Sequence, residues 1–73
     1  MAVIKAFGYL VKYLGSRRVV ISLDSPVRLR DLVDLPENVL DRVIILISGS
    51  PGSLSSFIQD ADEVSLLPVI SGG

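Results

Sequence analysis

The residues with the clearest chemical use in this sequence are its last two, Gly72 and Gly73, which follow the apolar segment VSLLPV at residues 64–69. An α-carboxylate has a pKa of about 3.3 to 3.7, so near neutral pH it is ionised and a poor electrophile. It reacts with a nucleophile only after activation, and the biological route is attack on ATP to give an acyl-adenylate. Two residues without a Cβ form a thin segment that can enter another protein's nucleotide site. We therefore expect the strand to anchor this tail and Gly73 to react, the alternative being a frayed or artificial terminus.

Chemistry by the chain's own side chains is not expected. The sequence has no Cys, His or Thr, which excludes the usual zinc sites and every Ser-His or Cys-His catalytic pair. We therefore predict no metal site, no bound cofactor and no enzymatic activity of its own. The net charge of -1 argues against nucleic acid and an anionic membrane as partners. The absence of a long apolar run or a secretory leader favours a cytoplasmic protein.

Two other stretches could carry chemistry but have simpler interpretations. The segment GSPGS at residues 49–53 is rich in glycine but lacks the lysine and the glycine spacing of a phosphate loop. We read it as a turn, with Pro51 and Gly52 at the centre of a type II turn. The acidic residues Asp60, Asp62 and Glu63 could act as acid and base or hold a cation, but such a local cluster is more often solvated surface.

The order of elements predicts one small domain with a mixed sheet. Strands are expected at residues 2–10, 17–24, 43–48 and 64–69, with Gly15 in the first connection. Leu29, Leu32 and Val33 have helical spacing, so an amphipathic helix is expected from Val27 until Pro36. Short helical turns are expected at residues 36–42 and 54–58. We predict an α+β fold in which the helix packs on one face of the sheet and the first and last strands are adjacent and parallel.

This order resembles the ubiquitin-like β-grasp proteins, and more narrowly the MoaD/ThiS family of sulfur carriers. Several motifs carry the resemblance: Phe7-Gly-x-Leu10 with Gly15, VIILISG ending at Gly49, Asp60-x-Asp-Glu-Val64, and Leu67-Pro-Val-x-Ser-Gly-Gly73. The likeness covers nearly the whole chain, and its terminal part is the most specific. Two positions depart from the family pattern, because Leu67 replaces a proline and Ala61 replaces a glycine.

The resemblance implies a β-grasp domain at residues 1–70 and a flexible Ser-Gly-Gly tail at residues 71–73. It implies that Gly73 is adenylated by a ubiquitin-activating-type enzyme that uses ATP. The product would become a thiocarboxylate for molybdopterin, thiamine or tRNA thiolation pathways. The implied partners are this adenylating enzyme and a synthase such as the large subunit of molybdopterin synthase. Two alternatives remain open: a modifier joined through Gly73 to target lysines, and a binding module with an inert tail.

We expect the partner to contact the tail and the sheet beside it. The predicted contact residues are Phe7, Leu67, Pro68, Val69, Ile70, Ser71 and Gly72. A chain of 73 residues with 49% hydrophobic content cannot readily bury every apolar side chain, so some of Phe7, Leu67, Val69 and Ile70 should form an exposed patch. The alternative is that these four are ordinary core residues.

Overall fold

The computed structural model describes residues 1–69, so the predictions for Ile70 and for the tail at residues 71–73 lie outside the described residues. Its strands are β1 (Ala2–Ala6), β2 (Arg18–Ile21), β3 (Val27–Arg28), β4 (Val43–Ile47), β5 (Ser50–Pro51), β6 (Phe57–Ile58) and β7 (Glu63–Pro68). Its helical elements are the 3-10 turns η1 (Gly8–Leu10) and η2 (Leu29–Asp31) and the short helices α1 (Val11–Leu14) and α2 (Glu37–Leu40).

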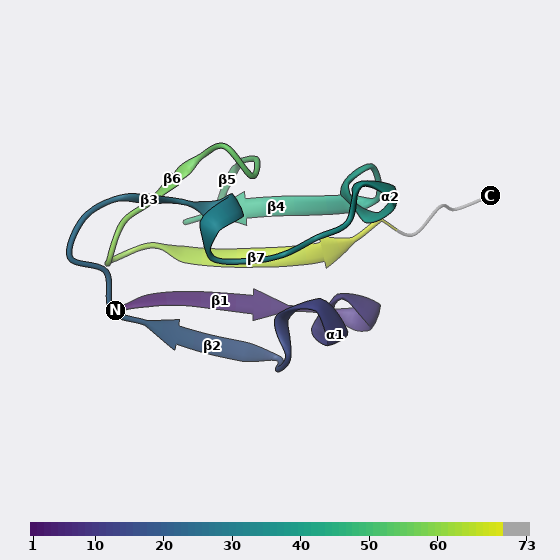
Figure 1. Ribbon diagram of the computed structural model, residues 1–73, viewed down its shortest axis with the longest axis horizontal. Helices are drawn as coiled ribbons and strands as arrows, with labels where there is room; N and C mark the ends of the chain where they lie inside the picture. Colours follow the sequence, from purple (N-terminus) through teal and green to yellow (C-terminus); the bar gives the residue numbers. More distant parts are fainter. Residues whose placement is uncertain (70–73) are drawn as a thin grey trace.

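A mixed five-stranded sheet with the order β2-β1-β7-β4-β5 forms the centre of the molecule (Figure 1). The strand β1 pairs with β7 in parallel, from Val3 beside Glu63 to Ala6 beside Leu66. Every other pair in this sheet is antiparallel. The prediction that the first and last strands are adjacent and parallel is therefore confirmed.

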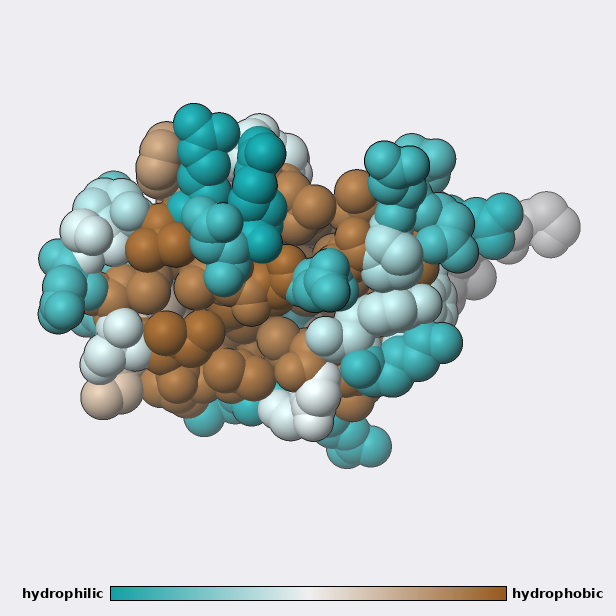
Figure 2. Space-filling model, in the orientation of Figure 1, coloured by the Kyte–Doolittle hydropathy of each residue, from teal (hydrophilic) through white to brown (hydrophobic). Residues whose placement is uncertain are grey.

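The core lies on the face of the sheet that residues 22–42 cross. Side chains alternate between the two faces of a strand, and Ile4, Val64 and Leu66 all point to this face and are almost fully buried. Leu29 and Val33 of the crossing segment, together with Leu10, pack with these residues and complete the core. Figure 2 shows apolar side chains gathered across the middle of this face. All described buried residues are apolar, so the core holds the fold by hydrophobic burial.

The amphipathic helix expected from Val27 does not form, and this prediction is wrong. Val27 and Arg28 instead pair with Phe57 and Ile58 as the two-stranded sheet β3-β6, and the Leu29 amide donates to the Ser56 carbonyl. Only the 3-10 turn η2 follows. The nine residues between Pro26 and Pro36 leave room for only a short helix, and the pairing of Val27 and Arg28 with β6 removes the first two of them.

The first strand is shorter than expected because Gly8 has a φ of +59° and turns the chain into η1 and α1. The longest continuous helical segment is therefore residues 8–14, and Gly15 ends it in the left-handed conformation with a φ of 87°. Leu10, Val11 and Leu14 turn this segment onto the core. The helical segment that packs on the core thus follows β1 directly, whereas we expected a non-helical connection around Gly15.

The turn in the glycine-rich segment also differs from the prediction. Ile47 pairs with Ser50, so the two-residue turn between β4 and β5 is Ser48-Gly49, not Pro51-Gly52. Both turn residues have a positive φ, as type I′ hairpins require. Pro51 lies in the edge strand β5, where a missing amide proton is tolerated. The segment at residues 54–58 ends in β6 and is not helical.

The acidic residues before β7 stabilise turns. Asp60 accepts a hydrogen bond from the Leu23 amide at 2.9 Å and pairs with the N-terminal ammonium at 3.3 Å. Asp62 accepts from the Ser48 hydroxyl and the Gln59 amide. Among the residues the structure describes, no group of three potential ligands could hold a metal ion. Within the same residues, no helix is long and apolar enough to cross a membrane.

We predict that Asp60→Asn weakens the acid dependence of stability. The Leu23 amide, and secondly the N-terminal ammonium, lower the pKa of Asp60. A lowered pKa in the folded state stabilises the protein above the ordinary aspartate value of about 3.9, and this contribution is lost as the pH falls through the lowered value. Urea unfolding from about pH 6 to pH 2.5 should therefore show a shallower loss of stability below about pH 4 in Asp60→Asn.

The exposed Asp34 provides the control, because it makes no ion pair or side-chain hydrogen bond with any described residue. Asp34→Asn should follow the wild-type curve. An Asp60→Asn curve that is parallel to wild type at every pH would contradict the prediction.

Candidate functional site

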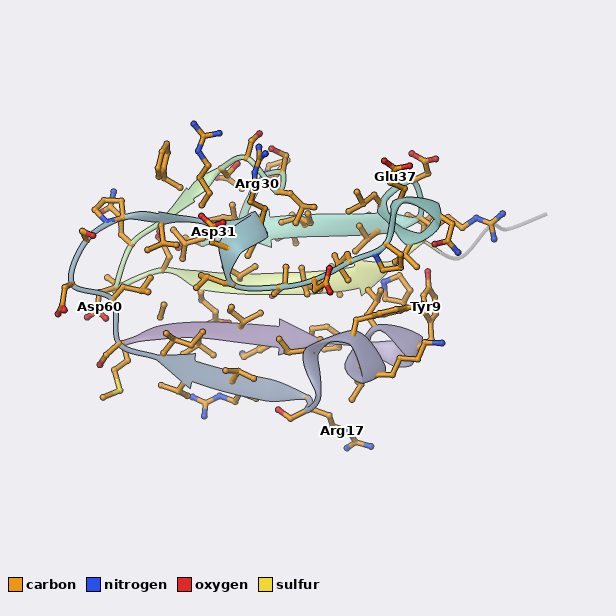
Figure 3. The ribbon with its side chains drawn as sticks, viewed as in Figure 1. Tyr9, Arg17, Arg30, Asp31, Glu37 and Asp60 are labelled. Atoms are coloured by element: carbon orange, nitrogen blue, oxygen red, sulfur yellow. The ribbon has the colours of Figure 1, made fainter. Side chains whose placement is uncertain are left out.

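The end of β7 is fixed by contacts with two other segments. The Val69 amide donates to the Arg42 carbonyl at 2.9 Å, which ties the chain after β7 to the connection between α2 and β4. The Tyr9 hydroxyl donates to the same carbonyl at 3.4 Å. Figure 3 shows Tyr9 between α1 and α2. Pro68 packs against Gly8, where an added Cβ would lie 3.1 Å from the proline ring. The segment that leads to the tail therefore starts from a defined position.

An apolar patch lies on the sheet face opposite the core, beside this position. Ile44 pairs directly with Leu67, and the Phe7 amide donates to the Leu66 carbonyl, which puts Phe7 beside Leu67. Phe7 is 44% exposed, and Ile44 and Val69 are each 45% exposed. We call Phe7, Ile44, Leu67 and Val69 the outer patch. Exposed apolar groups of this kind are typical of surfaces that bind another protein.

An ion pair lies next to the outer patch on the same face. Lys5 Nζ donates to Glu63 Oε1 at 2.8 Å, across the parallel pair β1-β7. This contact lowers the pKa of Glu63, and Arg18 adds a smaller effect of the same sign. Arg18 therefore shares this side of the sheet with Lys5 and Glu63, in keeping with its register opposite Lys5. The surface beside Phe7 is thus charged, whereas the surface beside Ile44 is apolar.

The structure brings together the predicted contact residues that it describes. The bond from the Val69 amide to the Arg42 carbonyl continues the ladder of β4 and β7, so alternation puts Val69 on the same face as Leu67 and Phe7. Pro68 is half-buried against Gly8, and the expected exposure of Phe7 and Val69 is found. Ile70, Ser71, Gly72 and Gly73 lie outside the described residues. Sequence reasoning missed Ile44 and Tyr9. The unbroken apolar run of β4 hides which of its residues is exposed, and only its pairing with β7 reveals it.

A separate hollow of about 500 Å³ lies over the core side of β4. Val43, Ile45 and Leu54 form apolar walls, and Arg30 stands at the rim beside two serine hydroxyls. Those hydroxyls, of Ser53 and Ser55, are 2.9 Å apart and bond to each other. Figure 3 shows Arg30 and its acidic neighbour Asp31 together on η2. Arg30 is the one charged residue that lines this hollow within residues 1–69, so a single cation sets its charge.

Comparison with known proteins decides the fold. No protein-family model matches the sequence, and no curated protein matches it. Solved structures do match. SAMP1 from Haloferax volcanii superposes with a TM-score of 0.70 at 24% identity, over 99% of this chain and 98% of the other. The chain has the ubiquitin-like β-grasp fold.

Two further β-grasp structures superpose over almost the same length. The small archaeal modifier protein SAMP1 from Methanosarcina acetivorans matches with a TM-score of 0.64 and 20% identity, over 99% of this chain and 95% of the other. A chain described as molybdopterin converting factor, subunit 1, from Pyrococcus furiosus matches with a TM-score of 0.63 and 20% identity, over 94% and 97%. The mixed-sheet β-grasp class predicted from the sequence is confirmed. The longest helical segment of this chain is residues 8–14, whereas we expected it to begin at Val27.

We predict that Gly8→Ala destabilises this β-grasp domain more than Gly15→Ala. Both glycines have a positive φ, which costs an L-residue roughly 1–2 kcal/mol. At Gly8 the new methyl group would also press on Pro68 at 3.1 Å, whereas nothing lies within 4 Å of the corresponding position at Gly15. Urea unfolding of the two variants measures the difference, and equal losses would show that the contact with Pro68 is easily relaxed.

Proposed function

We propose that this chain is a ubiquitin-like sulfur carrier whose Gly73 carboxylate is adenylated and then converted to a thiocarboxylate. The observation that carries the proposal is the pair Gly72-Gly73, which follows β7 by a few residues. β7 is a central strand of the sheet, and the exposed apolar residues on and beside it form the outer patch. The fold shared with a chain described as molybdopterin converting factor, subunit 1, supports it. In this role the chain is a substrate of other enzymes, and it binds no cofactor of its own.

The proposed chemistry needs two steps, both on a partner. An oxygen of the Gly73 carboxylate attacks the α-phosphorus of ATP, and pyrophosphate leaves. Hydrosulfide (HS⁻) from a sulfide-level donor then attacks the carbonyl carbon of the adenylate, AMP leaves with the electron pair of the broken C–O bond, and loss of the sulfur-bound proton gives the thiocarboxylate. Glycine at positions 72 and 73 keeps this carbonyl accessible, since no side chain flanks it. The sulfur would serve molybdopterin, thiamine or tRNA thiolation.

The outer patch is the proposed docking surface for the partners. In this proposal the adenylating enzyme covers Phe7, Ile44, Leu67 and Val69 while Ile70, Ser71, Gly72 and Gly73 enter its nucleotide site. A synthase, such as the large subunit of molybdopterin synthase, would later occupy the same surface. A few well-packed residues near the centre of such an interface supply most of the binding energy. Cytoplasmic enzymes of this kind would place the chain in the cytoplasm.

A second candidate function is protein modification. The similarity to SAMP1, a small archaeal modifier protein, favours it, and the same adenylate would then react with a lysine amine of a target protein. Because both functions share the first step, they differ only in the nucleophile that takes the acyl group. A binding module with an inert tail is the remaining alternative, and it requires no adenylate at all.

The expected products separate these functions. Intact mass spectrometry of the protein purified from its own cells should first establish that Gly73 carries the terminal carboxylate. Incubation with the cognate adenylating enzyme, ATP and a sulfur donor should then replace one oxygen by sulfur. Gly72→Val, and a variant extended by one alanine after Gly73, should lower the rate about a hundredfold, because small misplacements of a reacting group have effects of that size.

Unfolding curves of both tail variants should match wild type, which would assign the loss to the reaction. Conjugates to target lysines in place of the thiocarboxylate would favour the modifier function. Absence of both products with an enzyme that activates its other substrates would leave the binding module as the better account.

We also predict that Ile44→Ser raises the KM for adenylation at least about fivefold, since truncating an interface anchor costs more than about 1 kcal/mol. Val20→Ser is a matched control. Val20 pairs with Val3 on the same sheet face and is equally exposed at 45%, but it lies toward the other end of β1 from Phe7. Pyrophosphate exchange measures KM for both variants, and equal effects would place the docking surface elsewhere.

A further inference from the structure

A second hollow, of about 640 Å³, opens where β1, α1 and the start of β2 meet, and we call it the basic hollow. Three of its lining residues are cations, Lys5, Arg17 and Arg18, and its apolar wall includes Phe7 and Val11. Figure 3 shows Arg17 extending from the start of β2. Three of the seven lysines and arginines of the sequence therefore line one hollow, in a chain whose net charge is -1.

The positive charge of the basic hollow is only partly balanced. Lys5 and Arg18 stand directly opposite each other in the pairing of β1 with β2, and like charges in such positions destabilise a sheet. Glu63 pairs with Lys5 at 2.8 Å and is the one carboxylate that forms an ion pair with any of the three cations within residues 1–69. Arg17 and Arg18 are exposed and have no such pair among those residues. The hollow therefore has unpaired positive charge and favours an anionic ligand.

The backbone that carries the two arginines is held in place. The Ala6 amide donates to the Arg17 carbonyl at 3.0 Å, which extends the ladder of β1 and β2. The Ser16 hydroxyl donates to the Arg18 carbonyl at 2.7 Å and accepts from the Arg18 amide at 3.2 Å. A ligand would meet two cations whose main chain is already ordered, which reduces the entropy lost on binding.

The basic hollow is continuous with the outer patch, because Phe7 belongs to both. We propose that it receives an acidic segment of the protein that docks on the outer patch, with a carboxylate between the arginines and an apolar side chain against Phe7 and Val11. This inference rests on the proposed function, in which that protein is the adenylating enzyme. Arginine suits the role because its planar guanidinium can bind a carboxylate through two hydrogen bonds.

The same observations favour a protein segment over a nucleic acid. A polyanion would meet only three cations, one of them already paired with Glu63, on a chain that is negative overall. The hollow borders apolar side chains, and the sheet beside it has the apolar outer patch in place of further cations. Nucleic-acid surfaces need a broader basic stripe, because each phosphate contact contributes to affinity.

The test compares two double variants with the same change of charge. Arg17→Gln with Arg18→Gln removes charge from the basic hollow, and Arg28→Gln with Arg30→Gln removes it from β3 and η2. With the cognate adenylating enzyme at about 50 mM salt, the first pair should raise KM about tenfold and leave kcat unchanged, and the difference should shrink at 500 mM salt. The second pair should change KM less than about twofold.

A defined peptide probes the hollow without the enzyme. Acetyl-Leu-Glu-Glu-Leu-amide, titrated into the whole chain labelled with ¹⁵N, should shift amide signals of residues 5–11 and 16–19. The analogue with glutamine in place of glutamate should shift them much less. The Arg17→Gln, Arg18→Gln variant should lose the response, and the Arg28→Gln, Arg30→Gln variant should keep it.

Each outcome has one meaning. If the enzyme adenylates wild type but both double variants behave alike, the acidic-segment proposal is overturned and the proposed function stands. If the enzyme never adenylates wild type, the proposed function fails and the peptide titration alone decides the hollow. Equal shifts by the glutamate and glutamine peptides overturn the proposal. Stronger binding of sodium phosphate or of a single-stranded oligonucleotide than of the peptide also overturns it, since the hollow would then be a phosphate site.

Discussion

The parallel pairing of β1 with β7 is the constraint on which the rest of this structure depends. It joins the two ends of the chain at the centre of the sheet, so β2 must pair on one side and β4 on the other. Parallel neighbours require a long crossover, and residues 22–42 cross the face that holds the core. The same pairing places Phe7 beside Leu67 and Gly8 against Pro68. The outer patch and the fixed end of β7 are both consequences of it.

A chain of this length has too few residues to cover both faces of such a sheet. The crossover and residues 8–14 cover one face, and Ile4 and Leu66 are buried beneath them. The other face keeps Lys5 and Glu63 as a charged pair, but Ile44 and Val69 remain exposed on it. Exposed apolar area costs free energy in the isolated chain, and a partner that covers it recovers that free energy. The short length of the chain therefore explains both why one face stays uncovered and why a partner can bind there.

The sequence predicted the strands better than the connections between them. The apolar runs of β4 and β7 were predicted as strands, and so was the parallel pairing of the first strand with the last, whereas the pairing of β4 with β7 was not. The helix expected from Val27 failed because the spacing of Leu29, Leu32 and Val33 suits any turn that faces the core, and the pairing of Val27 with Ile58 is a non-local contact that periodicity cannot reveal. The exposure of Ile44 was hidden for a similar reason. Which residues of an apolar run face outward depends on the register with a strand elsewhere in the chain.

The geometry around Val69 limits how any partner could reach Gly73. Four residues follow Val69, and four fully extended residues span at most about 14 Å. In the proposed function, a nucleotide site that accepts the Gly73 carboxylate must lie within that distance of Val69, whose amide donates to the Arg42 carbonyl. A protein that approaches so closely also comes close to Val69 of the outer patch, and from there the patch extends through Leu67 to Phe7 and the basic hollow. In the proposed function, the short reach of the tail therefore links recognition of the sheet to access to the Gly73 carboxylate.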